Sequence, residues 1–266
     1  MTIGVLKEPA HETRVSMLAE ACATLTKKGI TVLAEAGAGE KAWCSDKEYE
    51  KAGVLVKSRS EVLATADIIL AIHPVADNEA KSLHGKILVG VYFPLYNPER
   101  TAAWKEAGIT VFSLDRLPRT TRAQSMDVLS SQANIAGYKA VLTAANAYGR
   151  YFPMFMTAAG SIAPAKVLIL GAGVAGLQAI ATARRLGAVI EVFDTRPAVK
   201  EEVMSLGAKF IEVEGAADAS KAGGYAVEQS ADFVQRQQAK IAESAAKADI
   251  IITTAQIPGK KAPILI

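Results

Sequence analysis

Residues 167–194, VLILGAGVAGLQAIATARRLGAVIEVFD, contain the clearest structural signal in the chain. Its first four residues are an apolar run typical of a buried strand, a Gly-x-Gly-x-x-Gly turn follows, and an alanine-rich stretch then predicts a helix. A second apolar run ends at Asp194, 23 residues after Gly171. A strand, a glycine turn, a helix and a second strand that ends in an acidic residue together predict dinucleotide binding.

Each conspicuous residue of this stretch has a physical role in such a site. Gly171 permits the tight turn, Gly173 lets the backbone approach a pyrophosphate, and Gly176 lets helix and strand pack closely. The N-terminus of the helix, which begins near Val174 and Ala175, attracts the anion. Asp194 would accept hydrogen bonds from the adenosine ribose and repel a 2′-phosphate, which favours NAD(H) over NADP(H).

Two alternatives stay open at this point. Arg196 could instead accept a 2′-phosphate, although an arginine beside a carboxylate more often forms a surface ion pair. The sheet could also have this fold and bind no nucleotide.

Along the whole chain, one pattern recurs five times: a helical segment, a glycine and a short apolar strand. The glycines are Gly29, Gly53, Gly108, Gly187 and Gly207. Glycine just past a helix end adopts a left-handed conformation at low cost and lets the chain enter a strand. The helix starts agree, because Ser45 and Ser58 each have Glu three residues on, and Asn97 precedes Pro98.

These signals predict an α/β fold with two Rossmann-like parallel-sheet domains joined by a long helix. We expect strands near residues 3–6, 31–35, 54–57, 67–72, 86–92 and 109–114, then near 166–170, 189–193, 209–213 and 249–253. Residues 122–150 contain no proline and predict the joining helix. The expected domains are residues 1–136 and 137–266.

Composition excludes several classes of protein. The 266 residues are 50% hydrophobic and 21% charged, and the net charge of +3 is too small to indicate binding to nucleic acid. Cys22 and Cys44 form no disulfide framework, and the three histidines do not cluster as zinc ligands. No targeting signal is evident, and the longest uncharged run, residues 167–183, is shorter than a membrane span. The sequence therefore predicts a soluble, cytoplasmic protein without a metal site and without direct membrane insertion.

A second polar cluster, residues 118–131, lies at the start of the predicted joining helix. Gln124, Asp127, Ser130 and Ser131 are three to four residues apart, so we expect them to share a helix face. Such a face offers donors and acceptors suited to a nicotinamide carboxamide and its ribose. The alternative is ordinary helix capping with a solvated polar face.

Several segments of the chain resemble one family closely. RTTRAQSMDVLSSQANIAGYKA, MTAAGSIAPAKVLILGAGVAGLQAIATARRLGA, FDTRP and ITTAQIPGKKAP are similar to the NAD(H)-binding component of proton-translocating transhydrogenases. The opening IGVLKEPAHETRVSM fits the same family and the related alanine dehydrogenases. The resemblance covers essentially the whole chain, and the RAQSMD stretch is typical of the transhydrogenase branch.

The resemblance implies roles for individual residues. Gln124 and Asp127 would act at the reacting nicotinamide, and Tyr225 would belong to a loop that closes over the nucleotide. The implied NAD(H)-binding residues are Arg119, Gln124, Asp127, Ser130, Gly171, Gly173, Val174, Ala175, Gly176, Asp194, Thr195, Arg196, Tyr225, Thr254 and Ala255.

The resemblance also implies partners. They are an NADP(H)-binding domain, a membrane-embedded proton channel that holds the chain at the inner face of the plasma membrane, and a second copy in a homodimer. Since the nucleotide domain of the family continues past the IPGKPAP-type segment, we expect the second domain to be truncated at its C-terminus.

The alternative enzyme is an alanine dehydrogenase, whose chemistry needs a lysine after the fourth strand and a histidine after the fifth. Ala71 stands at the expected lysine position and the sequence VGVYFPLY, residues 89–96, replaces the histidine region. Arg14 remains at the related carboxylate-binding position, and His73 is a substitute base or a structural histidine. A nucleotide-binding scaffold is the non-enzyme alternative, but it would not need the RAQSMD cluster.

Overall fold

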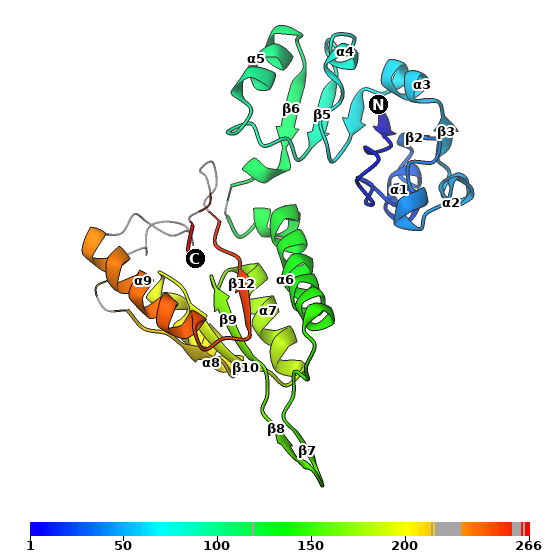
Figure 1. The fold of residues 1–266 in the computed structure, drawn as a ribbon. Helices are drawn as coiled ribbons and strands as arrows, with labels where there is room; N and C mark the ends of the chain where they lie inside the picture. The colour runs from blue at the N-terminus through cyan, green and yellow to red at the C-terminus, as the bar shows by residue number, and fades with distance from the viewer. Residues whose placement is uncertain (119, 214, 216–229, 257–261, 263) are drawn as a thin grey trace. The chain divides into compact units, whose positions relative to one another are not determined.

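The computed structural model describes residues 1–118, 120–213, 215, 230–256, 262 and 264–266. Contacts divide the chain into two compact units, Met1–Asp127 and Val128–Ile266, which we call unit 1 and unit 2 and describe separately. Each unit is built on a parallel sheet with helices around it, as the sequence predicts (Figure 1). The domain boundary between residues 136 and 137 stays a prediction.

Unit 1 holds a six-stranded sheet in which all neighbours are parallel, in the order β3-β2-β1-β4-β5-β6. This order is that of the doubly wound nucleotide-binding folds. The strands are β1 (Thr2–Val5), β2 (Thr31–Glu35), β3 (Leu55–Lys57), β4 (Ile68–Leu70), β5 (Ile87–Gly90) and β6 (Thr110–Ser113). The helices are α1 (Ala19–Thr26), α2 (Asp46–Lys51), α3 (Arg59–Thr65), α4 (Asp77–Ala80) and α5 (Pro98–Glu106), with 3₁₀ turns at Glu40–Ala42, Leu114–Arg116 and Ala123–Met126.

Unit 2 holds a four-stranded parallel sheet in the order β11-β10-β9-β12. The strands are β9 (Lys166–Leu170), β10 (Val189–Phe193), β11 (Lys209–Phe210) and β12 (Ile250–Thr253). The helices are α6 (Val128–Ala147), α7 (Val174–Arg185), α8 (Lys200–Ser205) and α9 (Ala231–Ala245), with a 3₁₀ turn at Pro197–Val199. All ten strands that the sequence predicts are therefore present, most of them shorter by a residue or more.

The local signals that predicted these elements are confirmed, with the exception of the Asn97 cap. All five glycines that follow helices have positive φ, between 71° and 92°. At Ser58 the Glu61 carboxylate accepts the backbone N–H at 2.9 Å, and Ser45 has the same capping box. Helix α5 begins at Pro98, but the Asn97 side chain does not cap it, because its amide donates to the Phe93 carbonyl at 3.1 Å.

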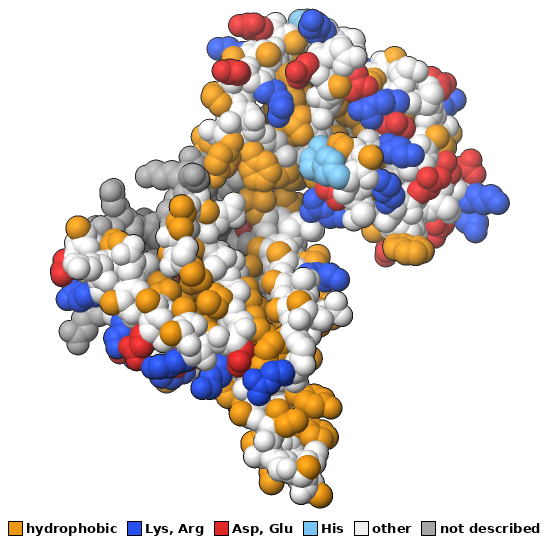
Figure 2. Space-filling view, in the orientation of Figure 1, with side chains coloured by type: hydrophobic (Ala, Val, Ile, Leu, Met, Phe, Trp, Pro, Cys, Tyr) orange, Lys and Arg blue, Asp and Glu red, His pale blue; other side chains and the backbone are white. Residues whose placement is uncertain are grey.

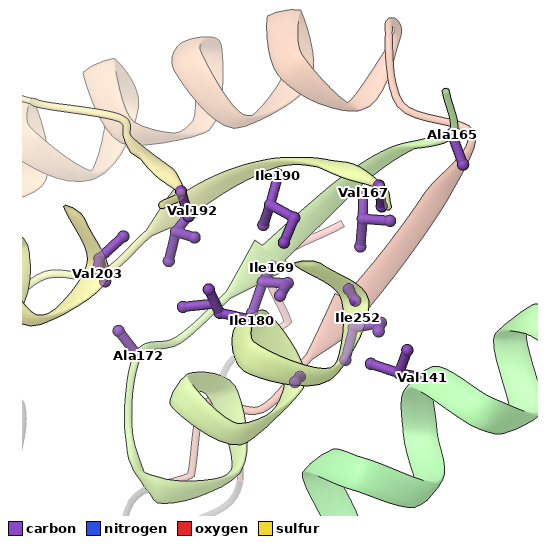
Figure 3. Packing of buried hydrophobic residues seen from close by; sticks show 14 of the residues in the cluster. Val141, Ala165, Val167, Ile169, Ala172, Ile180, Ile190, Val192, Val203 and Ile252 are labelled. Carbon is purple, nitrogen blue, oxygen red and sulfur yellow. The ribbon is translucent and has the colours of Figure 1, made fainter. Parts of the chain in front are cut away.

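The core of unit 2 explains why the strand before the glycine turn is apolar at every position from Val167 to Leu170. Val167 and Ile169 of β9 belong to a cluster with α6, α7 and α8, and Figure 3 shows Ile180 of α7 close to Ile169. Leu168 and Leu170 belong to a second cluster with α9. Both faces of β9 are buried, so the usual alternation of apolar and polar residues is lost.

The sequence did not predict a short antiparallel hairpin, β7 (Phe155–Thr157) and β8 (Gly160–Ile162). The hairpin extends away from the sheet of unit 2, and apolar side chains gather on it (Figures 1 and 2). Met154, Phe155 and Met156 are exposed, Met156 by 74%. Strands of three residues with exposed apolar side chains carry no alternation of apolar and polar positions, so the sequence gives no signal for them.

The predicted joining helix over residues 122–150 is wrong at its start. Residues 123–126 form a 3₁₀ turn and Asp127 has φ −75° and ψ 86°, which is not helical, so α6 begins at Val128. Aspartate is a preferred residue just before a helix, because its side chain can accept the unpaired N–H groups of the first turn. Within the described residues, no helix is both long and apolar enough to cross a membrane.

Candidate functional site

The glycine turn between β9 and α7 is the centre of the candidate site. Gly171 has φ +107°, a conformation that other residues rarely adopt, and its N–H donates to the Phe193 carbonyl at 2.8 Å. Gly173 precedes α7 in an extended conformation, with φ −78° and ψ −170°. The chain therefore leaves the buried strand, reverses over three residues and enters the helix.

Close contacts around this turn leave no room for a side chain at Gly171 or Gly176. A Cβ on Gly176 would lie 1.9 Å from the Gly171 carbonyl oxygen, and one on Gly171 would lie 2.7 Å from Thr254 Oγ1. Thr254 follows β12, and its hydroxyl donates to the Gly171 carbonyl at 2.9 Å. The Ala255 nitrogen lies 3.1 Å from the same Cβ position on Gly171. The structure thus brings Thr254 and Ala255 against the glycine turn, as their inclusion in one site requires.

Among the described residues, the space over Gly173 is open. A Cβ on Gly173 would meet no atom of these residues within 4 Å, in contrast to Gly171 and Gly176. The N–H groups of Val174 and Ala175 lie in the first turn of α7, where a helix has no acceptors of its own. Open backbone at a helix N-terminus is suited to an anion such as a pyrophosphate.

Asp194, at the end of β10, is tied to this turn. Its Oδ2 accepts the Ala172 N–H at 2.7 Å, and its Oδ1 accepts the backbone N–H of Arg196 at 2.8 Å. The Arg196 guanidinium adds two bonds, Nε to Oδ1 at 2.9 Å and Nη2 to Oδ2 at 2.8 Å. The side chains are only 7% and 19% exposed for Asp194 and Arg196. The arginine therefore forms an ion pair, but a largely buried one rather than one on the surface.

The electrostatics of this pair follow from its contacts. Burial alone would raise the pKa of Asp194, but the hydrogen bonds from Arg196 and the Ala172 backbone outweigh it, and the pKa is lowered. The hydrogen bond to Asp194 raises the pKa of Arg196, and the charge of Glu202 on α8 acts in the same direction. Asp194 is therefore a carboxylate at neutral pH. Thr195, between the two, is half-buried.

The second cluster is not arranged as predicted. Gln124 lies in the 3₁₀ turn and is exposed, Asp127 lies between that turn and α6, and Ser130 lies in the first turn of α6. Gln124 and Asp127 therefore do not share a helix face with Ser130. Arg119 and Tyr225 lie outside the described residues.

One contact, between α6 and the first turn of α7 beside the glycine turn, was not predicted from the sequence. A Cβ on Gly137 would lie 2.0 Å from the carbonyl oxygen of Ala175, so α6 crosses the first turn of α7 in close contact. The Asn134 amide donates to Gln178 Oε1 at 3.1 Å beside this crossing. A lone glycine inside an alanine-rich helix was the available signal, because glycine there costs stability unless packing requires it.

In unit 1, charged groups cluster after β1 and β4. Glu12 accepts Arg14 Nε at 2.9 Å and Nη2 at 2.7 Å, and it lies 2.9 Å from His73 Nε2. Glu8 accepts the backbone N–H groups of Ile72 and His73 at 2.6 and 3.0 Å. The hydrogen bonds from Arg14 hold the pKa of Glu12 well below its usual range, whereas burial raises that of Glu8. His11 contacts the His73 ring edge-on, with centroids 5.2 Å apart.

These features define unit 2 as a Rossmann-type domain, with an open glycine turn between its first strand and helix and an acidic residue at the end of its second strand. Residues 4–136 match the alanine dehydrogenase/PNT N-terminal domain, and residues 140–266 match the alanine dehydrogenase/PNT C-terminal domain. The chain belongs to the alanine dehydrogenase/PNT family, in the branch of the NAD(P) transhydrogenase alpha subunits.

The branch is defined by relatives that align along the whole chain. The chain is 46% identical over 270 residues to the NAD(P) transhydrogenase subunit alpha of Cereibacter sphaeroides. It is 45% identical over 273 residues to the first of the separate pieces of NAD(P) transhydrogenase subunit alpha in Rickettsia prowazekii. Both alignments cover 100% of this chain, which spans 52% of the first relative and 71% of the second. A crystal structure of transhydrogenase from Sinorhizobium meliloti superposes with a TM-score of 0.85, at 45% identity, over 99% of this chain and 72% of that one.

Proposed function

We propose that this chain is the NAD(H)-binding component of a proton-translocating transhydrogenase and positions NADH for direct hydride transfer to NADP⁺ on a separate domain. The observation that carries the proposal is the open glycine turn with Asp194 at its side, in a chain 45–46% identical to transhydrogenase alpha subunits. The transfer would be coupled to proton translocation by the other components of the enzyme.

The residues of unit 2 fit a dinucleotide. The N–H groups of Val174 and Ala175 would bind the pyrophosphate over Gly173, where a side chain would fill the space. Asp194 would accept hydrogen bonds from the adenosine ribose, with Thr195 and Arg196 beside it. Thr254 and Ala255 would line the turn from β12, and Tyr225 would cover the nucleotide.

Residues near the start of α6 would hold the nicotinamide end. Arg119, Gln124, Asp127 and Ser130 would orient the ring through its carboxamide and ribose. NADH supplies the hydride, and no separate proton moves when one nicotinamide reduces another. Correct placement of the reacting atoms is therefore the main requirement, and placement of this kind can contribute about 7–11 kcal/mol to lowering a barrier.

The arrangement of unit 1 weighs against an alanine dehydrogenase. Reduction of a keto acid needs a cation for the substrate carboxylate and a proton donor. The two Arg14 nitrogens closest to Glu12, Nε and Nη2, both donate to it, and His73 Nε2 contacts the same carboxylate. Glu12 thus neutralises the cation that a substrate carboxylate would need.

The proposed partners are an NADP(H)-binding domain, a membrane-embedded proton channel and a second copy of this chain. The chain would lie at the inner face of the plasma membrane through these partners. The exposed apolar hairpin β7–β8 supports a homodimer, because an apolar surface on a projecting element favours association.

The test combines the chain with the NADP(H)-binding component of a transhydrogenase, NADH and an NADP⁺ analogue that absorbs at a distinct wavelength when reduced. A second reaction replaces the partner and the analogue with pyruvate and ammonium. We expect reduction of the analogue in the first reaction alone. Steady oxidation of NADH by pyruvate and ammonium would instead establish an alanine dehydrogenase, and His73 would be the first residue to replace.

A further inference from the structure

NADH and NADPH differ at one position, the 2′-oxygen of the adenosine ribose, which carries a phosphate in NADPH. Rossmann domains distinguish the two at the end of the second strand. An acidic residue there accepts hydrogen bonds from the ribose hydroxyls of NAD, and an arginine nearby accommodates the 2′-phosphate of NADP. This chain has both groups within two residues, Asp194 and Arg196.

The contacts between Asp194 and Arg196 determine which of the two groups is available to the ribose or to a 2′-phosphate. Nε and Nη2 of Arg196 each donate to a different oxygen of Asp194, at 2.9 and 2.8 Å. This is the two-point contact that an arginine also makes with a phosphate. The edge of the guanidinium that carries Nε and Nη2 cannot bind the Asp194 carboxylate and a phosphate at once. The Ala172 and Arg196 backbone N–H groups hold the carboxylate in place, at 2.7 and 2.8 Å.

We propose that Arg196 is a latent 2′-phosphate-binding residue that Asp194 holds neutralised, so that the pair, rather than Asp194 alone, determines the choice of NAD(H) over NADP(H). The proposal rests on the proposed function, since it assumes that this site binds a nicotinamide dinucleotide. It assigns Asp194 a second role beside that of ribose acceptor. The carboxylate repels a 2′-phosphate and also occupies the cation that would otherwise attract it.

The surroundings of the pair support this assignment. The Arg196 and Asp194 side chains are only 19% and 7% exposed, so solvent screens their attraction little. The contact with a carboxylate therefore stabilises the guanidinium more than it would at the surface. Glu202 is a second acidic group whose charge acts on Arg196. It would remain after loss of Asp194 and would limit, without abolishing, the attraction for a phosphate. A purely structural arginine would make the same contacts to Asp194 but would not affect NADPH binding once Asp194 is gone.

The test measures the dissociation constants of NADH and NADPH for the whole chain and three variants: Asp194→Ser, Asp194→Ser with Arg196→Ala, and Asp194→Ser with Arg185→Ala. Arg185 ends α7 and is exposed, so the third variant removes the same charge at the far end of the helix. Asp194→Asn is included because it keeps an acceptor for the Ala172 N–H if the serine variant folds poorly. Circular dichroism confirms that each variant is folded.

We expect Asp194→Ser to tighten NADPH binding by about tenfold or more, as a new charge-assisted contact implies. Adding Arg196→Ala should reverse that gain, whereas adding Arg185→Ala should keep it. Equal NADPH dissociation constants for the first two variants would show that Arg196 binds no 2′-phosphate and overturn the proposal. Failure of the unmodified chain to bind NADH would instead overturn the proposed function.

Discussion

Replacing Gly137 with alanine should destabilise unit 2 by roughly 1–2 kcal/mol. The added Cβ would lie 2.0 Å from the carbonyl oxygen of Ala175 and 2.8 Å from its carbonyl carbon. Both are backbone atoms, so no side-chain rotation relieves the contact and the two helices must move apart. Overpacking of this kind costs about 1–3 kcal/mol, and we expect a cost near the upper end of this range because the contacts are with backbone atoms. Alanine in place of glycine inside a helix returns about 1 kcal/mol, which leaves the net loss given above.

Urea unfolding can measure this effect in unit 2 separately. Trp43 and Trp104, the only two tryptophans, both lie in unit 1, so tryptophan fluorescence follows unit 1 while far-UV circular dichroism follows both units. With a slope of about 2 kcal/mol per molar urea, the dichroism transition of unit 2 should move down by roughly 0.5–1 M. Gly149→Ala is the control, because a Cβ there meets no atom of the described residues within 4 Å, and it should change little. A Gly137→Ala protein as stable as the unmodified chain would refute the close crossing of α6 and α7.

Two further predictions concern the nicotinamide end and the charge cluster of unit 1. Gln124→Asn keeps the amide but shortens its reach. Hydride transfer in the reconstituted assay should therefore fall by about tenfold or more, while the NADH dissociation constant changes by less than about threefold. Equal losses in transfer rate and in NADH affinity would make Gln124 a simple binding residue. Glu12→Gln should lower the free energy of unfolding of unit 1 by about 2 kcal/mol at pH 7, because hydrogen bonds to a buried carboxylate are lost. Since the pKa of Glu12 is lower in the folded chain than its ordinary 4.5, this contribution is complete above pH 4.5 and declines as the pH falls below it. Glu8→Gln is the control with the opposite sign: the pKa of Glu8 is raised, so its ionisation opposes folding at pH 7 and its replacement should cost less than that of Glu12.

The fold could be predicted where the signal is local. Gly29 and its four counterparts mark helix ends because the conformation they adopt is costly for any other residue, whatever the rest of the chain does. The apolar run of β9 identified a strand with both faces buried. The prediction of a helix before α6 was wrong because it rested on local helix propensity alone. Alanine, glutamine and methionine in residues 123–126 favour a helix, but Asp127 ends the turn and starts a new helix after it.

The candidate site could be predicted as far as the backbone determines it. The conformation of Gly171 and the contact between Gly176 and Gly171 follow from the order of strand, turn and helix. The arrangement of the side chains does not follow from this order. Whether Arg196 faces solvent, a phosphate or Asp194 depends on the Ala172 N–H and on α8, which carries Glu202, and neither is visible in the residues that flank Arg196.

The two units use acidic residues in the same way, and this bears on the chemistry that each can perform. In unit 1, Glu12 neutralises Arg14 and contacts His73, so the groups that could serve a keto acid are engaged within the protein. In unit 2, Asp194 neutralises Arg196, but the open backbone over Gly173 and the first turn of α7 is left without such a partner among the described contacts. In the proposed binding mode the pyrophosphate lies at the helix N-terminus, and a further phosphate on the adenosine ribose would meet the Asp194 carboxylate. The proposed function, in which this chain holds NAD(H) beside a partner that holds NADP(H), requires this discrimination, because net transfer between the two nucleotide pools needs a different nucleotide in each site.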